Sequence, residues 1–165
     1  MQEERELALR PIGRVVKGHP RPDPARPERE EPWEEGTSEI EIDAAWADGL
    51  DGIEGFSHLW VIWWLDRFEE PPRALRIHPQ GRQDVPLVGL FATRSPHRPC
   101  PIATTPVKLL KHQGSRLRVQ GLDAYEGTVV LDIKPYLRRG DLIEDATVPE
   151  WLERLWRATD AEREI

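Results

Sequence analysis

Short apolar runs of strand length recur along most of the chain. Ser38–Ile42 alternates polar and apolar side chains, which is typical of a strand with one buried face. His58–Leu65 is almost continuously apolar and rich in Trp and β-branched residues, so we expect a central strand buried on both faces. Val85–Thr93 predicts another such strand. Further strands are expected over Ala8–Val16, Ile102–Lys111, Arg116–Gln120 and Thr128–Ile133, the second and third joined by a turn at Gly114.

Helical signals are few. Asp43 stands where it would cap a short helix over Ala44–Leu50. A longer helix is expected at the C-terminal end, beginning near Glu150 and placing Trp151, Leu152, Leu155 and Trp156 on one face. Because about six strands follow one another without alternating helices, we predict a mainly β fold, a small β-barrel with short helices and a C-terminal helix. No strand–GxG–helix unit is present, so a Rossmann-type cofactor site is not expected.

Length and composition set the domain organisation. With 165 residues, 38% hydrophobic and 32% charged, the chain is expected to form a single soluble domain over residues 1–165. We place the core at about residues 8–137 and a C-terminal extension with the helix at 138–165. The proline-rich segment His19–Trp33 is expected to be an extended loop. The single cysteine, the charged N-terminus and the lack of a bilayer-length apolar run predict a cytoplasmic protein with no membrane contact.

Charge is segregated along the chain. A net charge of −7 argues against non-specific nucleic-acid binding, because neutralising phosphates requires Lys and Arg. Acidic residues crowd Glu28–Glu41 and the C-terminal tail, while arginines gather in the middle third: Arg67, Arg73, Arg76, Arg82, Arg94 and Arg98. This segregation leaves room for a local basic patch.

The most unusual local sequence is Thr93–Ile102, TRSPHRPCPI. Its prolines restrict the backbone, which lowers the entropy lost when a ligand is held, and Arg94 and Arg98 can clamp a carboxylate or phosphate. The alternative is a rigid surface connection with solvated arginines. His97 and Cys100 are close enough in sequence for a nucleophile pair, but no third orienting group is evident, so we favour a simply buried cysteine.

The histidines carry no metal signature. They show neither HxH nor HExxH spacing, so no zinc site is expected. His58, at the start of an apolar strand, is interpreted as a hydrogen-bonded core histidine.

Two further segments carry polar groups next to predicted strands. GLDAYEG, residues 121–127, is bracketed by glycines that let a backbone approach a ligand closely, and its Asp123 and Glu126 could face a cation. An ordinary hairpin turn is the alternative. Asp66 and Arg67 follow the strand at His58–Leu65, where strand ends usually meet a pocket, although an ion pair or solvated cap is the default for them.

Three segments together resemble the signature blocks of a known family. GFSHLWVIWWLDR, FATRSPHRPCPIATTPVKLL and GLDAYEGTVVLDIKPYL are similar, in order and spacing, to those of the TrmO family, also called YaeB or TsaA-like. The resemblance runs from about Ile12 to Tyr136, and its most specific part combines RSPHRP with DIKPY. It implies a small β-barrel that binds S-adenosylmethionine, forms homodimers and methylates N(6)-threonylcarbamoyladenosine in tRNA.

The resemblance also implies a set of site residues. The cofactor contacts of the family fall on Pro24, Ala25, Arg26, Asp66, Arg67, Arg94, Thr104, Ala124, Tyr125, Glu126 and Gly127. Candidates for contact with the substrate are Ser95, His97, Arg98, Cys100, Lys134 and Tyr136. The chain departs from the family pattern at Cys100, Ala103 and Thr104, where the family has Asn, Gly and Leu, and at Arg26, which replaces Gln. These departures lie beside the expected methyl-transfer centre and leave the acceptor open.

The predicted function is that of an S-adenosylmethionine-dependent methyltransferase acting on tRNA. Transfer of a methyl group from a sulfonium mainly requires that donor and acceptor be held in line in a dry pocket, so no nucleophile or metal is needed. No residue is identified as a general base. The alternatives are a methyltransferase for another nucleoside or small molecule and a non-catalytic module that binds S-adenosylmethionine.

Overall fold

The computed structural model describes residues 8–21 and 33–163. The candidates Pro24, Ala25 and Arg26 lie outside these residues. The chain divides into two compact units, which are described separately: one combines the residues up to Arg67 with Pro101–Tyr136, and the other combines Phe68–Cys100 with the residues from Leu137 onward.

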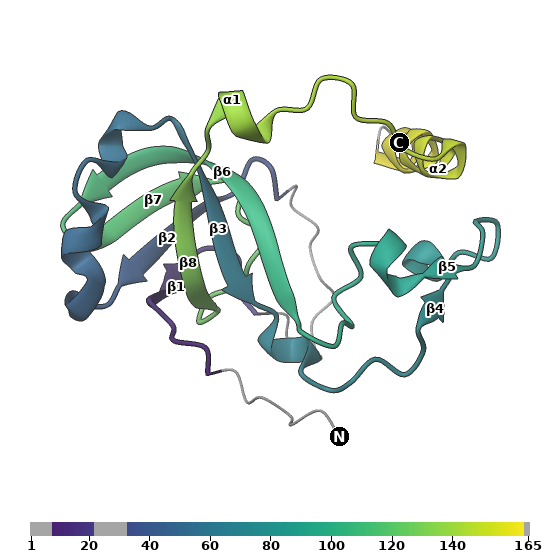
Figure 1. Ribbon diagram of the computed structural model, residues 1–165, viewed down its shortest axis with the longest axis horizontal. Helices are drawn as coiled ribbons and strands as arrows, with labels where there is room; N and C mark the ends of the chain where they lie inside the picture. Colours follow the sequence, from purple (N-terminus) through teal and green to yellow (C-terminus); the bar gives the residue numbers. More distant parts are fainter. Residues whose placement is uncertain (1–7, 22–32, 164–165) are drawn as a thin grey trace. The chain divides into compact units, whose positions relative to one another are not determined.

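The first unit is a closed antiparallel barrel with the strand order β1-β2-β7-β6-β3-β8 (Figure 1). Its strands are β1 (Gly13–Lys17), β2 (Thr37–Ile42), β3 (His58–Trp64), β6 (Ile102–Gln113), β7 (Arg116–Gln120) and β8 (Val129–Pro135). Between β2 and β3 lie two 3-10 helices, η1 (Ala44–Leu50) and η2 (Ile53–Gly55). The predicted mainly β barrel is therefore confirmed, and the predicted helix over Ala44–Leu50 is present as η1, although the Asp43 side chain makes no capping hydrogen bond.

Alternation along the strands fills the barrel with branched aliphatic side chains. Every second residue points inward, and this set is almost completely buried: Val15, Ile40, Leu59, Val61, Val107, Leu117, Val119 and Val130. The intervening residues face outward. Burying each of these side chains contributes roughly 1.5–3 kcal/mol to folding, so the alternation also fixes the register of each strand.

β3 is central but is not buried on both faces, as the sequence had suggested. It pairs with β6 on one side and with β8 on the other. Leu59, Val61 and Trp63 point into the barrel, whereas the outward-facing Trp60 is only half-buried. A closed barrel has one interior, so the outer side of even its most apolar strand is covered only in part. His58 is exposed and hydrogen-bonded to Ser57 Oγ (2.9 Å), so the prediction of a core histidine is wrong.

The barrel has two ends, which we name after residues on them. The Asp66 end is formed by the segment after β1, the start of β2, the residues after β3, the start of β6 and the loop between β7 and β8. The Tyr136 end is formed by the start of β1, the end of β2, the start of β3, the β6–β7 turn and the end of β8. This assignment follows from the antiparallel register, for example Trp63 opposite Val130 and Leu59 opposite Pro135.

The second unit contains little regular structure. A two-stranded sheet joins β4 (Arg76–Ile77) to β5 (Val88–Gly89), and short 3-10 helices follow as η4 (Pro79–Gly81) and η5 (Leu90–Ala92), with η3 (Asp66–Phe68) at the boundary. The prediction of a buried strand over Val85–Thr93 is wrong. Pro86 lacks a backbone donor, Val85 and Leu90 are buried, and Phe91 is 75% exposed, so neither periodicity nor hydrogen bonding suits a central strand.

Two helices complete the second unit, α1 (Arg138–Asp141) and α2 (Glu150–Arg163). The C-terminal helix therefore begins where it was predicted. Its apolar face is narrower than expected: Leu155 is 5% exposed, but Trp156 is 50% exposed. Among the described residues, no helix combines the length and apolar character that crossing a membrane requires.

Candidate functional site

The structure brings together at the Asp66 end several of the residues nominated from the sequence. Asp66 forms an ion pair with Arg21, whose Nε also donates to the main-chain oxygen of Glu126 at 2.9 Å. The Arg67 guanidinium lies 5.4 Å from the centre of the Tyr125 ring. Arg21 thus links the segment after β1 to the end of β3 and to the 121–127 loop. No sequence pattern indicates this role, since Arg21 stands in the proline-rich stretch and 45 residues before its partner.

The 121–127 loop is held by main-chain hydrogen bonds and by two glycines with positive φ. Gly121 has a φ of 88° and Gly127 a φ of 81°, a conformation that side chains rarely allow. Glu126 N–H donates to His19 O at 2.9 Å, and Gly127 N–H donates to Val15 O at 2.8 Å. The loop is therefore anchored to β1 and to the segment after it. Ala124 is completely buried, so a ligand at this end meets the main chain there and not the side chain.

A row of rings lines one side of the Asp66 end. The His19 and Trp33 rings are 4.0 Å apart, and the Trp33 and Tyr125 rings are 5.3 Å apart. The His19 ring packs so closely on Gly36 that a Cβ there would lie 2.3 Å from its Nε2. This nitrogen is buried and has no hydrogen-bond partner among the described residues. The rings are inclined to one another by 51° and 66°, and they give the site a largely apolar aromatic surface edged by the Arg67 guanidinium.

A hydrogen-bonded chain leads from the barrel interior to a carboxylate at the same end. Trp63 Nε1 donates to Thr105 Oγ1 at 3.1 Å, and the Thr105 hydroxyl donates to Asp123. Thr105 faces inward, opposite Val61, whereas Thr104 lies opposite Ile62 on the exposed outer wall. The structure therefore places Thr105, and not the neighbouring Thr104, beside the polar groups of this end. Alternation along β6 could have indicated this distinction.

The TRSPHRP loop belongs to the second unit and is braced by its own side chains. Arg98 Nη1 donates to Thr93 O at 2.9 Å and to Ser95 O at 3.4 Å, and its guanidinium lies 5.6 Å from the centre of the Phe91 ring. His97 contacts the Phe68 ring edge-on at 4.8 Å. Arg98 thus holds the loop in shape.

Arg94 and Cys100 differ from these braced residues. Arg94 is exposed, and its side chain makes no hydrogen bond or ion pair within the part of the chain that the structure describes. It is therefore available to an anionic ligand. Cys100 is exposed, so the expectation of a buried cysteine is wrong.

Lys134 and Tyr136 lie away from this cluster. Both are on the outer wall near the Tyr136 end, where Lys134 is opposite Trp60 and forms an ion pair with Asp132 at 2.6 Å. The Tyr136 ring is 5.7 Å from that of Trp60. The structure therefore does not bring these two candidates together with Asp66 and Tyr125.

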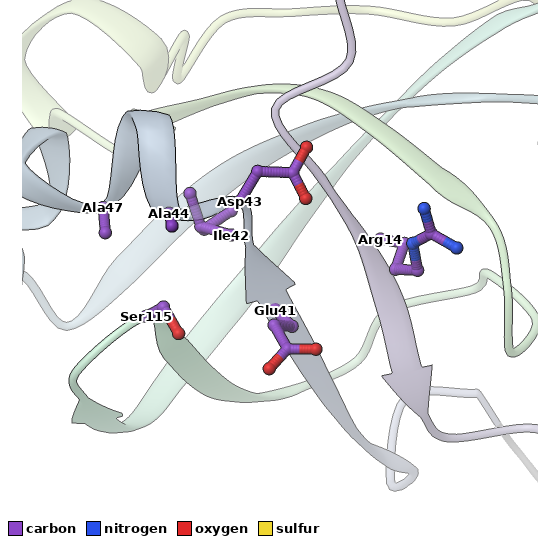
Figure 2. Close-up of a pocket in the computed structure, with 7 residues that line it drawn as sticks. All are labelled: Arg14, Glu41, Ile42, Asp43, Ala44, Ala47 and Ser115. Atoms are coloured by element: carbon purple, nitrogen blue, oxygen red, sulfur yellow. The ribbon is translucent and has the colours of Figure 1, made fainter.

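A hollow of about 360 Å³ lies toward the Tyr136 end. Figure 2 shows the side chains of Arg14, Glu41 and Asp43 spread around it. Glu41 is engaged by Arg116 at 3.1 Å, and none of the residues nominated from the sequence contributes to the lining. The hollow lacks aromatic side chains, so the Asp66 end is the better candidate for a cofactor. Over the described ranges, no group of His, Cys, Asp and Glu is arranged to hold a metal ion.

The fold and the site define a small closed barrel with a ring-lined, carboxylate-bearing end. The family profile for the tRNA-methyltransferase O N-terminal domain matches residues 21–142, and the chain belongs to this family.

Individual relatives agree with this assignment. A protein from Archaeoglobus fulgidus is 45% identical over 123 residues, which cover 71% of this chain and 31% of that protein. One from Methanothermobacter thermautotrophicus is 40% identical over 135 residues, covering 79% of this chain and 90% of the relative. Both bear the name "Probable S-adenosyl-L-methionine-binding protein".

A solved structure is also similar. The crystal structure of TrmO from Pseudomonas aeruginosa superposes with a TM-score of 0.69 at 28% identity, covering 91% of this chain and 63% of that one. The chain therefore spans less than two thirds of this TrmO and about a third of the Archaeoglobus relative.

Proposed function

We propose that the chain is an S-adenosylmethionine-dependent methyltransferase that modifies tRNA, with N(6)-threonylcarbamoyladenosine as the acceptor. Family membership and the names of the relatives support this function. The observation that carries it is the cluster at the Asp66 end, where four separate segments bring rings, carboxylates and main-chain groups together.

The groups at the Asp66 end match the chemical parts of S-adenosylmethionine. Aromatic faces at Trp33 and Tyr125 fit a purine ring, and the main chain of the 121–127 loop can bind its polar edge. The Asp123 carboxylate, which accepts a hydrogen bond from the Thr105 hydroxyl, favours a cation, whereas the Asp66 carboxylate is paired with Arg21. Bound S-adenosylmethionine would supply a methyl group on a sulfonium whose leaving group departs neutral. The residues of this end would hold and orient donor and acceptor and exclude water, which can account for most of the rate.

Arg94 is proposed to anchor an anionic group of the cofactor. The purified chain is expected to bind S-adenosylmethionine in the micromolar range, and Arg94→Ala is expected to weaken binding by about 1–3 kcal/mol, the range for a hydrogen bond to a charged group. Isothermal titration calorimetry measures both. Arg154→Ala, on α2, is the matched control and should bind as the wild type does. Equal affinity in Arg94→Ala and wild type would remove Arg94 from the site.

The chain is also proposed to act as a two-fold homodimer, the commonest closed assembly. Large apolar side chains remain uncovered in the single chain, among them Phe91 at 75% exposed, Leu75 at 67% and Trp156 at 50%. Light scattering at micromolar concentration is expected to give twice the mass of the 19.0 kDa chain. A mass equal to one chain would contradict the dimer.

Two other functions fit the same cluster. The chain could methylate another nucleoside or a small molecule, or it could bind S-adenosylmethionine without turnover. Formation of S-adenosylhomocysteine in the presence of whole tRNA distinguishes an enzyme from a binding module. Mass spectrometry of the tRNA then identifies the methylated base.

A further inference from the structure

Basic side chains gather on one part of the outer wall of the barrel, in a protein whose net charge is −7. On β6, Lys108 follows the buried Val107 and therefore faces outward. Lys111 lies directly opposite Arg118, which stands on β7 between two buried residues and also faces outward. The three cations thus form a row across two paired strands.

These three side chains are not neutralised by ion pairs. Within the described ranges, Lys108, Lys111 and Arg118 take part in none, although Glu39 lies opposite Arg118 on β2. Their neighbours differ, since Arg116 is paired with Glu41 and Lys134 with Asp132. The row therefore presents positive charge to whatever lies beside it.

Aromatic rings continue the same wall on β3 and β8. His58 lies directly opposite Lys108 in the β3–β6 pair, so the rings begin where the cations end. The Tyr136 ring is 6.4 Å from that of His58 and 5.7 Å from that of Trp60. His58 is exposed, and the other two are half-buried. The three aromatic rings therefore lie next to the three cations on the same outer wall.

We propose that this wall binds the tRNA substrate at a distance from the methyl-transfer centre. The basic face, as we call it, comprises His58, Trp60, Lys108, Lys111, Arg118 and Tyr136. The proposal rests on the tRNA methyltransferase function proposed above. Cations of this kind neutralise backbone phosphates, and aromatic faces stack on unpaired bases without reading their sequence.

The position of the basic face indicates the size of the acceptor. β3 runs from His58 to Trp64, so at about 3.3 Å per residue the His58 side of the basic face lies roughly 20 Å from the Asp66 end. Arg118 lies nearer, since it precedes Gly121 by three residues along β7 and the loop that follows, about 10 Å. A nucleoside or a small metabolite at Asp66 cannot also contact the His58 side of the basic face. A folded RNA arm can do so, with the modified base at the Asp66 end and its backbone along β6 and β7. The basic face therefore explains how an acidic protein would select tRNA over a free nucleoside.

The test measures binding of total tRNA at two salt concentrations. The variant Lys111→Ala/Arg118→Ala is compared with Arg154→Ala/Arg157→Ala, which removes the same charge from the exposed side of α2. The first variant is expected to bind roughly tenfold more weakly, with a salt slope shallower by about 2, because each phosphate contact contributes close to one unit. The control is expected to match the wild type, and both are expected to retain S-adenosylmethionine binding.

Tyr136→Leu tests the rings separately. It keeps an apolar side chain beside Trp60, and it is expected to weaken tRNA binding roughly fivefold or more with no change in salt slope, because stacking releases no counterions. Far-UV circular dichroism verifies that the barrel is intact.

Three results would overturn the proposal. Salt-sensitive tRNA binding by the wild type that is unaltered in Lys111→Ala/Arg118→Ala would reject the basic face and leave the tRNA function standing. A change from dimeric to monomeric mass in Tyr136→Leu would show that a second copy of the chain covers this wall. No tRNA binding by a wild-type preparation that still binds S-adenosylmethionine would reject the tRNA substrate itself.

Discussion

Replacing Gly13 with Ala is expected to lower the melting temperature of the protein by about 5–10 °C. A Cβ at this position would lie 2.1 Å from the main-chain oxygen of Glu41 and 2.9 Å from the Cα of Ile42. Both are backbone atoms of the paired strand β2, so no side chain can move aside. Overpacking typically destabilises a protein by about 1–3 kcal/mol. This loss is larger than the gain of roughly 0.5–1 kcal/mol in stability that Ala usually gives over Gly in a strand.

The melting shift follows from the size of the chain. A loss of 1 kcal/mol lowers the melting temperature by roughly 2–4 °C in a domain of this length. Gly49→Ala is the matched control, because a Cβ there meets no atom within 4 Å and Gly49 has no positive φ. It is expected to melt within about 2 °C of the wild type. If thermal unfolding followed by circular dichroism gave the same midpoint for both variants, the close β1–β2 approach would be disproved.

Methyl transfer to tRNA carrying N(6)-threonylcarbamoyladenosine is expected from the purified chain, with formation of S-adenosylhomocysteine. A modified adenine in a single-stranded loop is already accessible, so little unstacking work opposes its entry into a site. tRNA that lacks the modification is the substrate control and should accept no methyl group. Because phosphate contacts release counterions, tRNA binding should weaken steeply with added salt.

A pair of variants connects this activity to the Asp66 end. Asp66→Ala removes the carboxylate that pairs with Arg21 and is expected to lower the transfer rate roughly 100-fold, since misplacement of reacting groups by about 1 Å has effects of that size. Glu150→Ala removes the partner of Arg154 on α2 and should retain the rate of the wild type. An Asp66→Ala variant with the transfer rate of the wild type would show that the reaction does not take place at the Asp66 end. No transfer and no salt-sensitive binding by the wild type would favour a small-molecule acceptor.

Alternation of apolar and polar residues predicted most of the barrel. β2, the β6–β7 hairpin and β8 lie where their patterns indicated, because an inward-facing branched residue at every second position is required by any strand with one buried face. Continuous apolar runs were less informative. The run at His58–Leu65 proved to be a strand, whereas only Val88–Gly89 of the run at Val85–Thr93 is a strand, paired with the two residues of β4. Hydrophobicity alone does not register the missing donor of Pro86 or the shortness of the partner strand.

The candidate site was predictable only in parts. The 121–127 loop could be nominated because its glycines take a conformation that few other residues allow. Arg21 and Trp33 could not, since their roles depend on contacts with residues far away in the sequence. Thr104, which the family resemblance nominates, faces outward, and the neighbouring Thr105 faces inward. The role of Thr104 stays a prediction.

Closure of the barrel depends on a narrow seam. In the β1–β8 pair, Gly13 lies opposite Val130 and Arg14 opposite Val129, and hydrogen bonds from Ile12 N–H to Val130 O and from Val15 N–H to Thr128 O flank these positions. The paired residues are more than a hundred residues apart in the sequence. Such a contact closes a very long loop, whose closure costs more entropy than that of a short loop, so we expect it to form late in folding. His19 and Arg21 follow β1 directly. Opening of the β1–β8 pair would therefore also displace residues of the Asp66 end. A bound cofactor that contacts these residues would in turn stabilise the closed barrel.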